Sequence, residues 1–363
     1  MTSQREEAMY PLPLVVHVIP YDGIGGVEVA ARSVDDGEHN GFRFWKCYLA
    51  HKGAGRSTDL TGQATYASEN DLHAYFSVIR RLWVLKPEVL IASLWRSCVV
   101  LVLLKIVRPR TKTVVFLHFT KDVHFLDKVF SRIAMALATE IWTDSVATRQ
   151  ARIPKWLLHR SRVISFMVES VMPLPRPMVR PKFIFWGRLQ AQKGLDLALE
   201  LFARIRLVFP DASFAVIGPD GGLKSHLLRQ VALLNLGGAV EFLGSMSRSQ
   251  IVQLAAEHSF YLQTSVMEGM AMSVVEAMQL GLVPVVTPVG EIAHYCADGE
   301  SAIFVGDIQQ TVRRVGALLV NPEAFSRMAT AAQGVWKGQR LYRDDVLAAC
   351  SEIMNRETSA SAD

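Results

Sequence analysis

Residues 172–182 read MPLPRPMVRPK and separate two similar halves of the chain. Four of these eleven residues are prolines. Proline fixes its own φ angle and lacks a backbone N–H donor, so a helix cannot continue through such a segment. Proline-rich segments are stiff and extended, which is typical of a connector between domains. The segment therefore predicts a boundary in a chain of 363 residues, which is long enough for two domains with separate hydrophobic cores.

Beyond the connector, short apolar runs alternate with segments of helical pattern. Strands are predicted at residues 183–187, 214–218, 240–244, 260–265, 283–287 and 302–305. Helices are predicted between them at residues 194–208, 223–234, 247–257 and about 270–282. Strands that alternate with helices in this way are typical of a parallel sheet covered by helices on both faces.

The same alternation precedes the connector, with strands predicted at residues 14–19, 42–50, 89–93, 113–118, 140–145 and 162–166. An amphipathic helical stretch at about 323–357 ends the pattern, and its part from about 336 to 357 is expected to pack back on the first domain. We therefore predict an α/β fold of two doubly wound, Rossmann-like domains, residues 1–172 and 183–335, with a linker at 173–182. Ligands of such sheets bind at the carboxyl ends of the strands, so we expect the two domains to face each other across a cleft.

The two halves of the chain differ in charge. Residues 1–181 hold 24 Lys and Arg against 16 Asp and Glu, a net charge of +8, and residues 182–363 hold 15 against 18, a net charge of −3, which together make the +5 of the chain. Eight cations between Arg80 and Lys112 face only one acid, Glu88. A solvated basic surface would explain this excess, and so would a surface that meets an anionic membrane or a phosphate-bearing substrate. Nucleic acid is not expected as a partner, because no recognition helix or aromatic interleaving accompanies the charge.

The sequence argues against export and against a membrane span. The amino-terminal segment MTSQREEAMYPLPL carries acids and prolines where a signal peptide needs an apolar core. The apolar run at residues 89–107 is interrupted by Arg96 and Lys105, and a buried strand followed by a helix explains it better than a span does. The four cysteines form no C-x-x-C pair, so neither a zinc site nor a disulfide is expected. We expect a cytoplasmic protein that can associate peripherally with the inner face of the cytoplasmic membrane.

A glycine-rich turn follows the first predicted strand. Residues 21–28 read YDGIGGVE, and Gly25 and Gly26 allow the backbone to approach a phosphate or a sugar at the start of a helix. A nicotinamide dinucleotide site is disfavoured, because the third glycine of G-x-G-x-x-G is absent and the second predicted strand does not end in an acid. His118 ends another predicted strand, where a histidine either supports the structure or lines a site.

The first strand after the connector is followed by RLQAQKG, which carries Arg188 and Lys193 just before a helix. Two cations at a strand end, together with helix-terminal amides, suit a diphosphate, although two solvated loop charges would look the same in the sequence. The backbone amides of Gly269, Met270 and Ala271, after a neighbouring strand, are expected to point to the same place. No D-x-D pair is present to hold a divalent ion, so we expect no metal and no separate cofactor.

Two carboxylates lie in the run VMEGMAMSVVEAMQLG, residues 266–281. Glu268 precedes the predicted apolar helix, and Glu276 lies about two turns inside it. A carboxylate in such surroundings needs hydrogen-bond partners or it becomes protonated. The local pattern is compatible both with a structural role and with a binding role.

Taken together, these motifs resemble glycosyltransferase family 4, whose members are retaining, nucleotide-sugar-dependent enzymes of the GT-B architecture. GRLQAQKG at 187–194 is similar to the family pattern G-R-L-x-x-x-K-G, and residues 265–291 are similar to its segment S-x-x-E-G-x-x-x-x-x-x-E-A-M-x-x-G-x-P-V-V. GIGGVE at 23–28 is similar to its amino-terminal G-G-x-E loop. The resemblance is dense over residues 183–305 and looser over residues 1–170.

The resemblance implies roles for the matching residues. In the family the first glutamate, Glu268 here, contacts hydroxyls of the transferred sugar, and the second, Glu276, accepts hydrogen bonds from the ribose. Arg188 and Lys193 match the positions that neutralise the departing diphosphate, and His118 matches a strand-end histidine that lines the sugar pocket. The implied reaction moves a sugar from a UDP- or GDP-linked donor to a hydroxyl of a saccharide or lipid-linked saccharide, with retention, in bacterial polysaccharide or glycolipid assembly.

The chain departs from the family pattern in several places. Ala271 stands where the family commonly has glycine, and one glycine, Gly290, stands where two are common. Residues 167–170, MVES, replace the usual asparagine–glycine turn near the domain boundary. Two other functions stay open: a nucleotide-sugar epimerase of the same fold, which would need an acid and a base near the sugar, and a non-catalytic GT-B binding protein.

Overall fold

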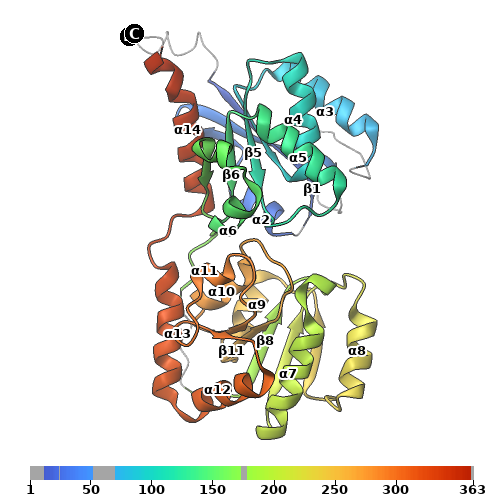
Figure 1. Ribbon diagram of the computed structural model, residues 1–363, viewed down its shortest axis with the longest axis vertical. Helices are drawn as coiled ribbons and strands as arrows, with labels where there is room; N and C mark the ends of the chain where they lie inside the picture. The colour runs from blue at the N-terminus through green and yellow to red at the C-terminus, as the bar shows by residue number, and fades with distance from the viewer. Residues whose placement is uncertain (1–11, 24, 52–69, 173–177, 361–363) are drawn as a thin grey trace. The chain divides into compact units, whose positions relative to one another are not determined.

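The structure, a computed structural model, describes residues 12–23, 25–51, 70–172 and 178–360. The chain divides into two compact units, of which unit 1 comprises Met1–Val168 and Arg340–Asp363, and unit 2 comprises Glu169–Gln339 (Figure 1). Residues 173–177 of the proline-rich connector lie outside the described residues.

Unit 1 is built on a seven-stranded sheet with the order β2-β3-β1-β4-β5-β6-β7. The strands are β1 (Leu14–Asp22), β2 (Gly37–His39), β3 (Phe42–His51), β4 (Val89–Ser93), β5 (Lys112–Leu117), β6 (Glu140–Thr143) and β7 (Ser161–Val163). All pairings are parallel except that of β2 with β3. The sequence did not predict β2, because three residues carry too little apolar alternation, and β7 is shorter than the predicted strand at 162–166.

The helices of unit 1 cover both faces of this sheet (Figure 1). They are α2 (Gly26–Arg32), α3 (Leu72–Leu85), α4 (Leu94–Val107), α5 (Phe125–Leu137), α6 (Val146–Arg152), the short 3-10 helix η1 (Lys155–Arg160) and α14 (Tyr342–Ala360). The apolar run at 89–107 is the strand β4 followed by α4, so the sequence prediction for it is confirmed. Within the described ranges, no helix is both long and apolar enough to cross a bilayer.

Helix α14 returns the end of the chain to unit 1. Tyr342 is 1% exposed, and its ring stacks on Phe116 at a centroid distance of 6.1 Å. Farther along the helix, Arg356 Nη1 lies 2.7 Å from Oε1 of the buried Glu140. The prediction of one helical stretch at 323–357 is wrong, because α13 (Pro322–Trp336) and α14 are separate helices. Gly338 lies between them at φ +76°, a left-handed conformation that ends helices.

Unit 2 is built on a six-stranded, all-parallel sheet with the order β10-β9-β8-β11-β12-β13. The strands are β8 (Lys182–Trp186), β9 (Ser213–Ile217), β10 (Val240–Gly244), β11 (Phe260–Gln263), β12 (Val283–Val286) and β13 (Ile303–Phe304). The order of connection reverses between β8 and β11. Such a switch point is where doubly wound sheets bind ligands, just beyond the carboxyl ends of the strands.

The helices of unit 2 are η2 (Ala191–Lys193), α7 (Leu195–Val208), α8 (Lys224–Leu233), α9 (Arg248–Ala255), α10 (Met272–Gln279), α11 (Ile292–Tyr295), α12 (Ile308–Val320) and α13. The strands β11 and β12 are buried along their whole length, as expected for a parallel sheet with helices on both faces. Phe183 and Phe260 stack at 5.0 Å in this core. The predicted fold class, an α/β chain with two Rossmann-like sheets, is confirmed.

Candidate functional site

The loops that follow β8 and β11 pack directly on one another. Gly194 has φ +60°, and a Cβ atom at this position would lie 2.0 Å from the carbonyl oxygen of Thr264. Thr264 Oγ1 donates a hydrogen bond to the Gly194 carbonyl at 2.6 Å, and Gln192 Nε2 donates to the Met267 carbonyl at 2.8 Å. Only glycine permits this approach, so the last glycine of GRLQAQKG is needed to bring the two loops together.

Lys193 and Glu268 form an ion pair across these two loops. Lys193 Nζ lies 2.7 Å from Glu268 Oε1, and the two side chains are 18% and 6% exposed. Ser265 Oγ and Gln263 Nε2 donate to the same oxygen at 2.6 and 3.2 Å. Three donors on Oε1 hold the carboxylate in one orientation. Its second oxygen, Oε2, has no hydrogen-bond partner in the described part of the chain. This oxygen can therefore accept a hydrogen bond from a hydroxyl of a ligand.

The amide of Gln263 is fully buried, and its orientation is fixed by its neighbours. Its Oε1 lies 2.8 Å from the Tyr261 hydroxyl and accepts a hydrogen bond from Ser273 Oγ at 2.9 Å. Burial raises the pKa of Tyr261 well above its ordinary value, so the phenol keeps its proton. Because both neighbours occupy Oε1, the Nε2 group of Gln263 faces Glu268.

Glu276 is held from two sides, and its side chain is 22% exposed. Trp186 Nε1 donates to Glu276 Oε2 at 2.9 Å, and Arg248 Nη1 donates to Oε1. Arg248 Nε also lies 3.0 Å from Oε2 of Glu169. Glu276 is a residue expected from the sequence, whereas Trp186 and Arg248 are not. The position of Trp186, next to the G-R-L motif, is a sequence signal for its role, whereas nothing in the sequence around Arg248 indicates its partner.

Arg188 follows β8 and is partly buried. Its guanidinium has no hydrogen bond or ion pair with any residue that the structure describes. The neighbouring Gly187 lies beside the Lys193 side chain, because a Cβ atom at Gly187 would be 3.7 Å from Lys193 Cε. The two cations of the motif therefore flank the same short piece of backbone.

The loop before α10 has a left-handed residue that is not glycine. Ala271 caps the helix with φ +56° and ψ +62°, and α10 begins at Met272, two residues later than predicted. The backbone N–H groups of Gly269, Met270 and Ala271 have no hydrogen-bond acceptor within the described residues, and no side chain caps the helix. These amides are free to meet an anion.

His118 follows β5 in unit 1 and is 5% exposed. Its Nε2 lies 3.1 Å from Ser93 Oγ, and Nε2 of His17 lies 2.8 Å from the same hydroxyl. Burial lowers the pKa of both imidazoles to about 3, so both are neutral at neutral pH. The buried Nδ1 atoms of both rings lack a partner in the described part of the chain.

The predicted residues are thus divided between the two units. Gly25 and Gly26 lie in unit 1, where Gly25 caps α2 with an ordinary φ of −79° and the preceding Ile24 lies outside the described residues. Of the unit 2 residues, Lys193 and Glu268 are in direct contact.

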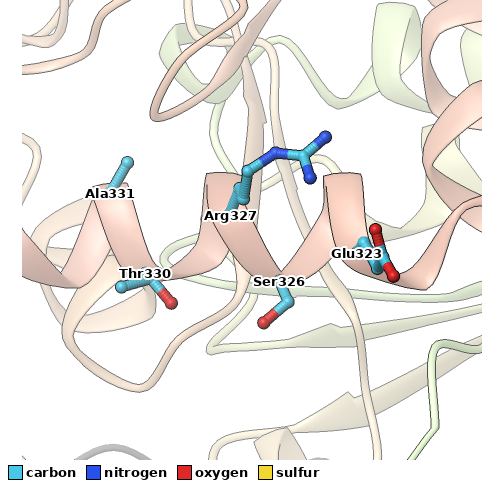
Figure 2. Close-up of a pocket in the computed structure, with 5 residues that line it drawn as sticks. All are labelled: Glu323, Ser326, Arg327, Thr330 and Ala331. Atoms are coloured by element: carbon cyan, nitrogen blue, oxygen red, sulfur yellow. The ribbon is translucent and has the colours of Figure 1, made fainter.

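A surface hollow of about 620 Å³ lies elsewhere, along α13 (Figure 2). It is lined by Glu323, Ser326, Arg327, Thr330 and Ala331, which all belong to that one helix. Figure 2 shows the Arg327 side chain pointing away from that of Ser326, so the polar groups do not converge. We do not assign a ligand to this hollow.

Ala271→Gly is expected to raise the free energy of unfolding by about 0.5–1 kcal/mol. A left-handed alanine costs about 1–2 kcal/mol, and the greater freedom of glycine in the unfolded chain offsets part of the gain. Urea denaturation monitored by tryptophan fluorescence would measure the change. The control, Ala198→Gly within α7, should lower the same free energy by about 1 kcal/mol, and a loss of stability in both variants would contradict the left-handed assignment.

Stability should fall as the pH drops from about 6.5 toward 3, because His17 and His118 stay neutral in the folded chain and bind protons in the unfolded chain. Their contribution is fully present above pH 6.5 and is lost on the acid side. His118→Gln should therefore make the urea midpoint less dependent on pH between about 7 and 4 than in the wild type. Parallel pH profiles for the two proteins would rule out this contribution of His118.

Known proteins resemble parts of this chain in sequence. Residues 172–335 match the family model of "Glycosyl transferases group 1". The chain is 27% identical over 142 residues to a phosphatidylinositol N-acetylglucosaminyltransferase subunit of Arabidopsis thaliana. The aligned part makes up 38% of this chain and 32% of that protein. It is 28% identical over 121 residues to a GDP-mannose:cellobiosyl-diphosphopolyprenol alpha-mannosyltransferase of Komagataeibacter xylinus. The aligned part makes up 33% of this chain and 31% of that protein. The chain thus spans about a third of the length of these relatives.

Solved structures match over nearly the whole chain. The Anabaena protein HepE, crystallised with UDP-glucose, aligns with a TM-score of 0.74 and 18% identity over 95% of this chain and 99% of that one. Sucrose-phosphate synthase of Thermosynechococcus elongatus aligns with a TM-score of 0.70 and 14% identity over 96% and 100%. These likenesses extend the fold assignment beyond the segment that the family model matches. Residues 172–335 therefore have the sequence pattern of the group 1 glycosyl transferases, and the chain as a whole has the GT-B fold.

Proposed function

We propose that the protein is a retaining glycosyltransferase of family 4, which moves a hexose from a UDP- or GDP-linked donor to an acceptor hydroxyl without a divalent metal ion. The observation that carries this proposal is the arrangement of the loops after β8 and β11, where Lys193 and Glu268 are in contact and Arg188 has no partner among the described residues. The family match over residues 172–335 supports it, as do the activities named for the relatives.

The donor diphosphate would lie between the cations and the free amides of the loop before α10. All N–H groups of the Arg188 guanidinium can donate hydrogen bonds to a ligand. The Lys193 ammonium can donate two hydrogen bonds besides the one that Glu268 accepts. The amides of Gly269, Met270 and Ala271 would add dipoles of the same sign. Glu268 would accept a hydrogen bond from a sugar hydroxyl on Oε2. Glu276 would accept hydrogen bonds from the ribose hydroxyls.

In the transfer step, the bond between the anomeric carbon and the diphosphate breaks, and its electron pair stays on the diphosphate oxygen. An acceptor hydroxyl forms the new bond to the same face of the anomeric carbon, and its proton passes to the leaving phosphate. Charge therefore builds up on the diphosphate in the transition state, where Arg188 and Lys193 stabilise it most strongly. Interactions that strengthen in this way accelerate the chemical step rather than donor binding.

The acceptor in this proposal is a saccharide or lipid-linked saccharide of bacterial polysaccharide or glycolipid assembly. Its support is the named substrate of the Komagataeibacter xylinus relative, a cellobiosyl-diphosphopolyprenol. Within unit 1, the residues that we propose to bind a ligand are His118, Gly25 and Gly26. The neutral state of His118 suits a hydrogen-bonding role toward a hydroxyl better than a role as a cation.

Arg188→Ala should slow sugar transfer by about 10²–10³-fold, because one group that stabilises the leaving diphosphate is lost. Glu276→Ala should mainly weaken nucleotide binding. Both are measured with labelled UDP- and GDP-sugars and a saccharide and lipid extract as the acceptor, and the product linkage is determined by NMR.

The matched control is Arg204→Ala, which removes an exposed cation from α7 and should leave the rate unchanged. Parental rates in Arg188→Ala and Glu276→Ala would refute the proposed site. Conversion of the free donor to its epimer, without transfer, would show an epimerase instead, and donor binding without any turnover would show a binding protein.

We further propose that unit 1 docks on an anionic membrane through the helices α3, α4 and α5. These helices expose large apolar side chains, and α3 and α4 also carry the cations Arg80, Arg81, Arg96 and Lys105. The exposed apolar residues include Phe76 (73%), Trp83 (58%), Ile106 (72%) and Phe125 (75%). Cations draw such a surface to acidic lipids, and apolar side chains then enter the boundary between headgroups and acyl chains.

The protein should float with vesicles that contain phosphatidylglycerol and not with vesicles of phosphatidylcholine alone, at moderate salt. The double variant Phe76→Ser with Trp83→Ser should lower the floated fraction several-fold, since it removes the largest exposed apolar side chains of α3. Leu207→Ser, which changes a side chain 75% exposed on α7 of unit 2, is the control. Flotation that does not depend on acidic lipid would refute docking through this surface.

A further inference from the structure

We infer that Arg248 is a positioning residue that orients Glu276 to bind the two hydroxyls of a ribose. This inference rests on the proposed function, in which Glu276 contacts the ribose of the donor. It concerns a residue that belongs to none of the motifs recognised in the sequence.

The backbone at Arg248 is firmly placed. Arg248 is the first residue of α9, and the preceding Ser247 forms a capping box with Gln250. Ser247 Oγ accepts a hydrogen bond from Gln250 N, and Gln250 Oε1 accepts one from Ser247 N at 2.9 Å. The reciprocal cap fixes the start of the helix, and therefore the position from which the arginine side chain extends.

The guanidinium joins two carboxylates. Arg248 Nη1 donates to Glu276 Oε1, and Arg248 Nε contacts Glu169 Oε2 at 3.0 Å. Glu169 belongs to the MVES segment that replaces the usual turn of the family, and its side chain is 58% exposed. The donors of the planar guanidinium have a fixed geometry relative to one another. The contact of Glu169 with Nε therefore also fixes the orientation of Nη1.

Arg248 and Trp186 together hold the plane of the Glu276 carboxylate. Each of them occupies one oxygen, Arg248 on Oε1 and Trp186 on Oε2 at 2.9 Å. A carboxylate has about four acceptor positions, so each oxygen keeps one position for a further donor. The two vicinal hydroxyls of a ribose are two such donors side by side. A carboxylate already held in place loses less conformational freedom when it binds them.

The segment that carries Glu169 is attached to α10 at a second point. The backbone N–H of Val171 donates to Gln279 Oε1 at 2.8 Å, on the helix that carries Glu276. Glu169 and Val171, which both belong to unit 2, therefore lie close to this helix and its arginine partner. The MVES replacement, which the family pattern does not explain, supplies the outer partner of Arg248.

The experiment compares nucleotides with and without the ribose hydroxyls. The dissociation constants of UDP and GDP, and of their 2′,3′-dideoxy counterparts, are measured by calorimetry for the wild type, Arg248→Ala, Arg248→Lys and Glu169→Gln. Arg248→Ala should raise the dissociation constant of the better-bound ribonucleotide roughly 10-fold. It should raise that of the dideoxy counterpart less than about 2-fold. Arg248→Lys should restore part of the loss, and Glu169→Gln should have a smaller effect of the same pattern.

A general electrostatic or structural role would weaken both kinds of nucleotide equally, and that result would overturn the inference while leaving the proposed function intact. Tighter ribonucleotide binding by Arg248→Ala would also overturn it, because Arg248 would then compete with the ribose. If the wild type bound ribo- and dideoxynucleotides equally, both the inference and the proposed role of Glu276 would fail. Arg204→Ala controls for the loss of a positive charge, and thermal melting of each variant controls for folding.

Discussion

The ion pair between Lys193 and Glu268 is the contact on which the rest of the site depends. It joins the loop after β8 to the loop after β11, two segments that become neighbours only because the order of connection reverses there. A buried carboxylate without its partner is costly, so the pair also constrains both loops. Gly194 makes the contact sterically feasible, since a side chain at that position would collide with the Thr264 carbonyl.

The two glutamates of the site are held in different ways. Three donors converge on one oxygen of Glu268, and the other oxygen is left for a ligand within the described surroundings. Glu276 instead has one donor on each oxygen. The first arrangement suits a single hydroxyl, and the second suits a pair of hydroxyls. This difference matches the sugar and ribose roles that we propose for them.

The two units are also chemically different, in agreement with the charge division of the sequence. Unit 1 carries the eight cations between Arg80 and Lys112 and the exposed apolar side chains of α3, α4 and α5. Unit 2 carries the loops whose cations and carboxylates suit a nucleotide sugar. In the function that we propose, a soluble donor and a saccharide or lipid-linked acceptor would use these separate parts of the chain.

The α/β class, most strand positions and the segments that form the loops of unit 2 follow from the sequence alone. Local periodicity and strand-end residues carry that information, as the division of residues 89–107 into β4 and α4 illustrates. The family resemblance supplied roles for His118, Arg188, Lys193, Glu268 and Glu276, and these roles stay predictions.

Which side chains meet depends on the three-dimensional arrangement of the elements. The contacts of Glu276 with Trp186 and Arg248, and of His118 and His17 with Ser93, join segments far apart in the chain. Periodicity reports which face of an element is buried. It does not report which distant element lies against that face, since the crossovers of the sheet determine this.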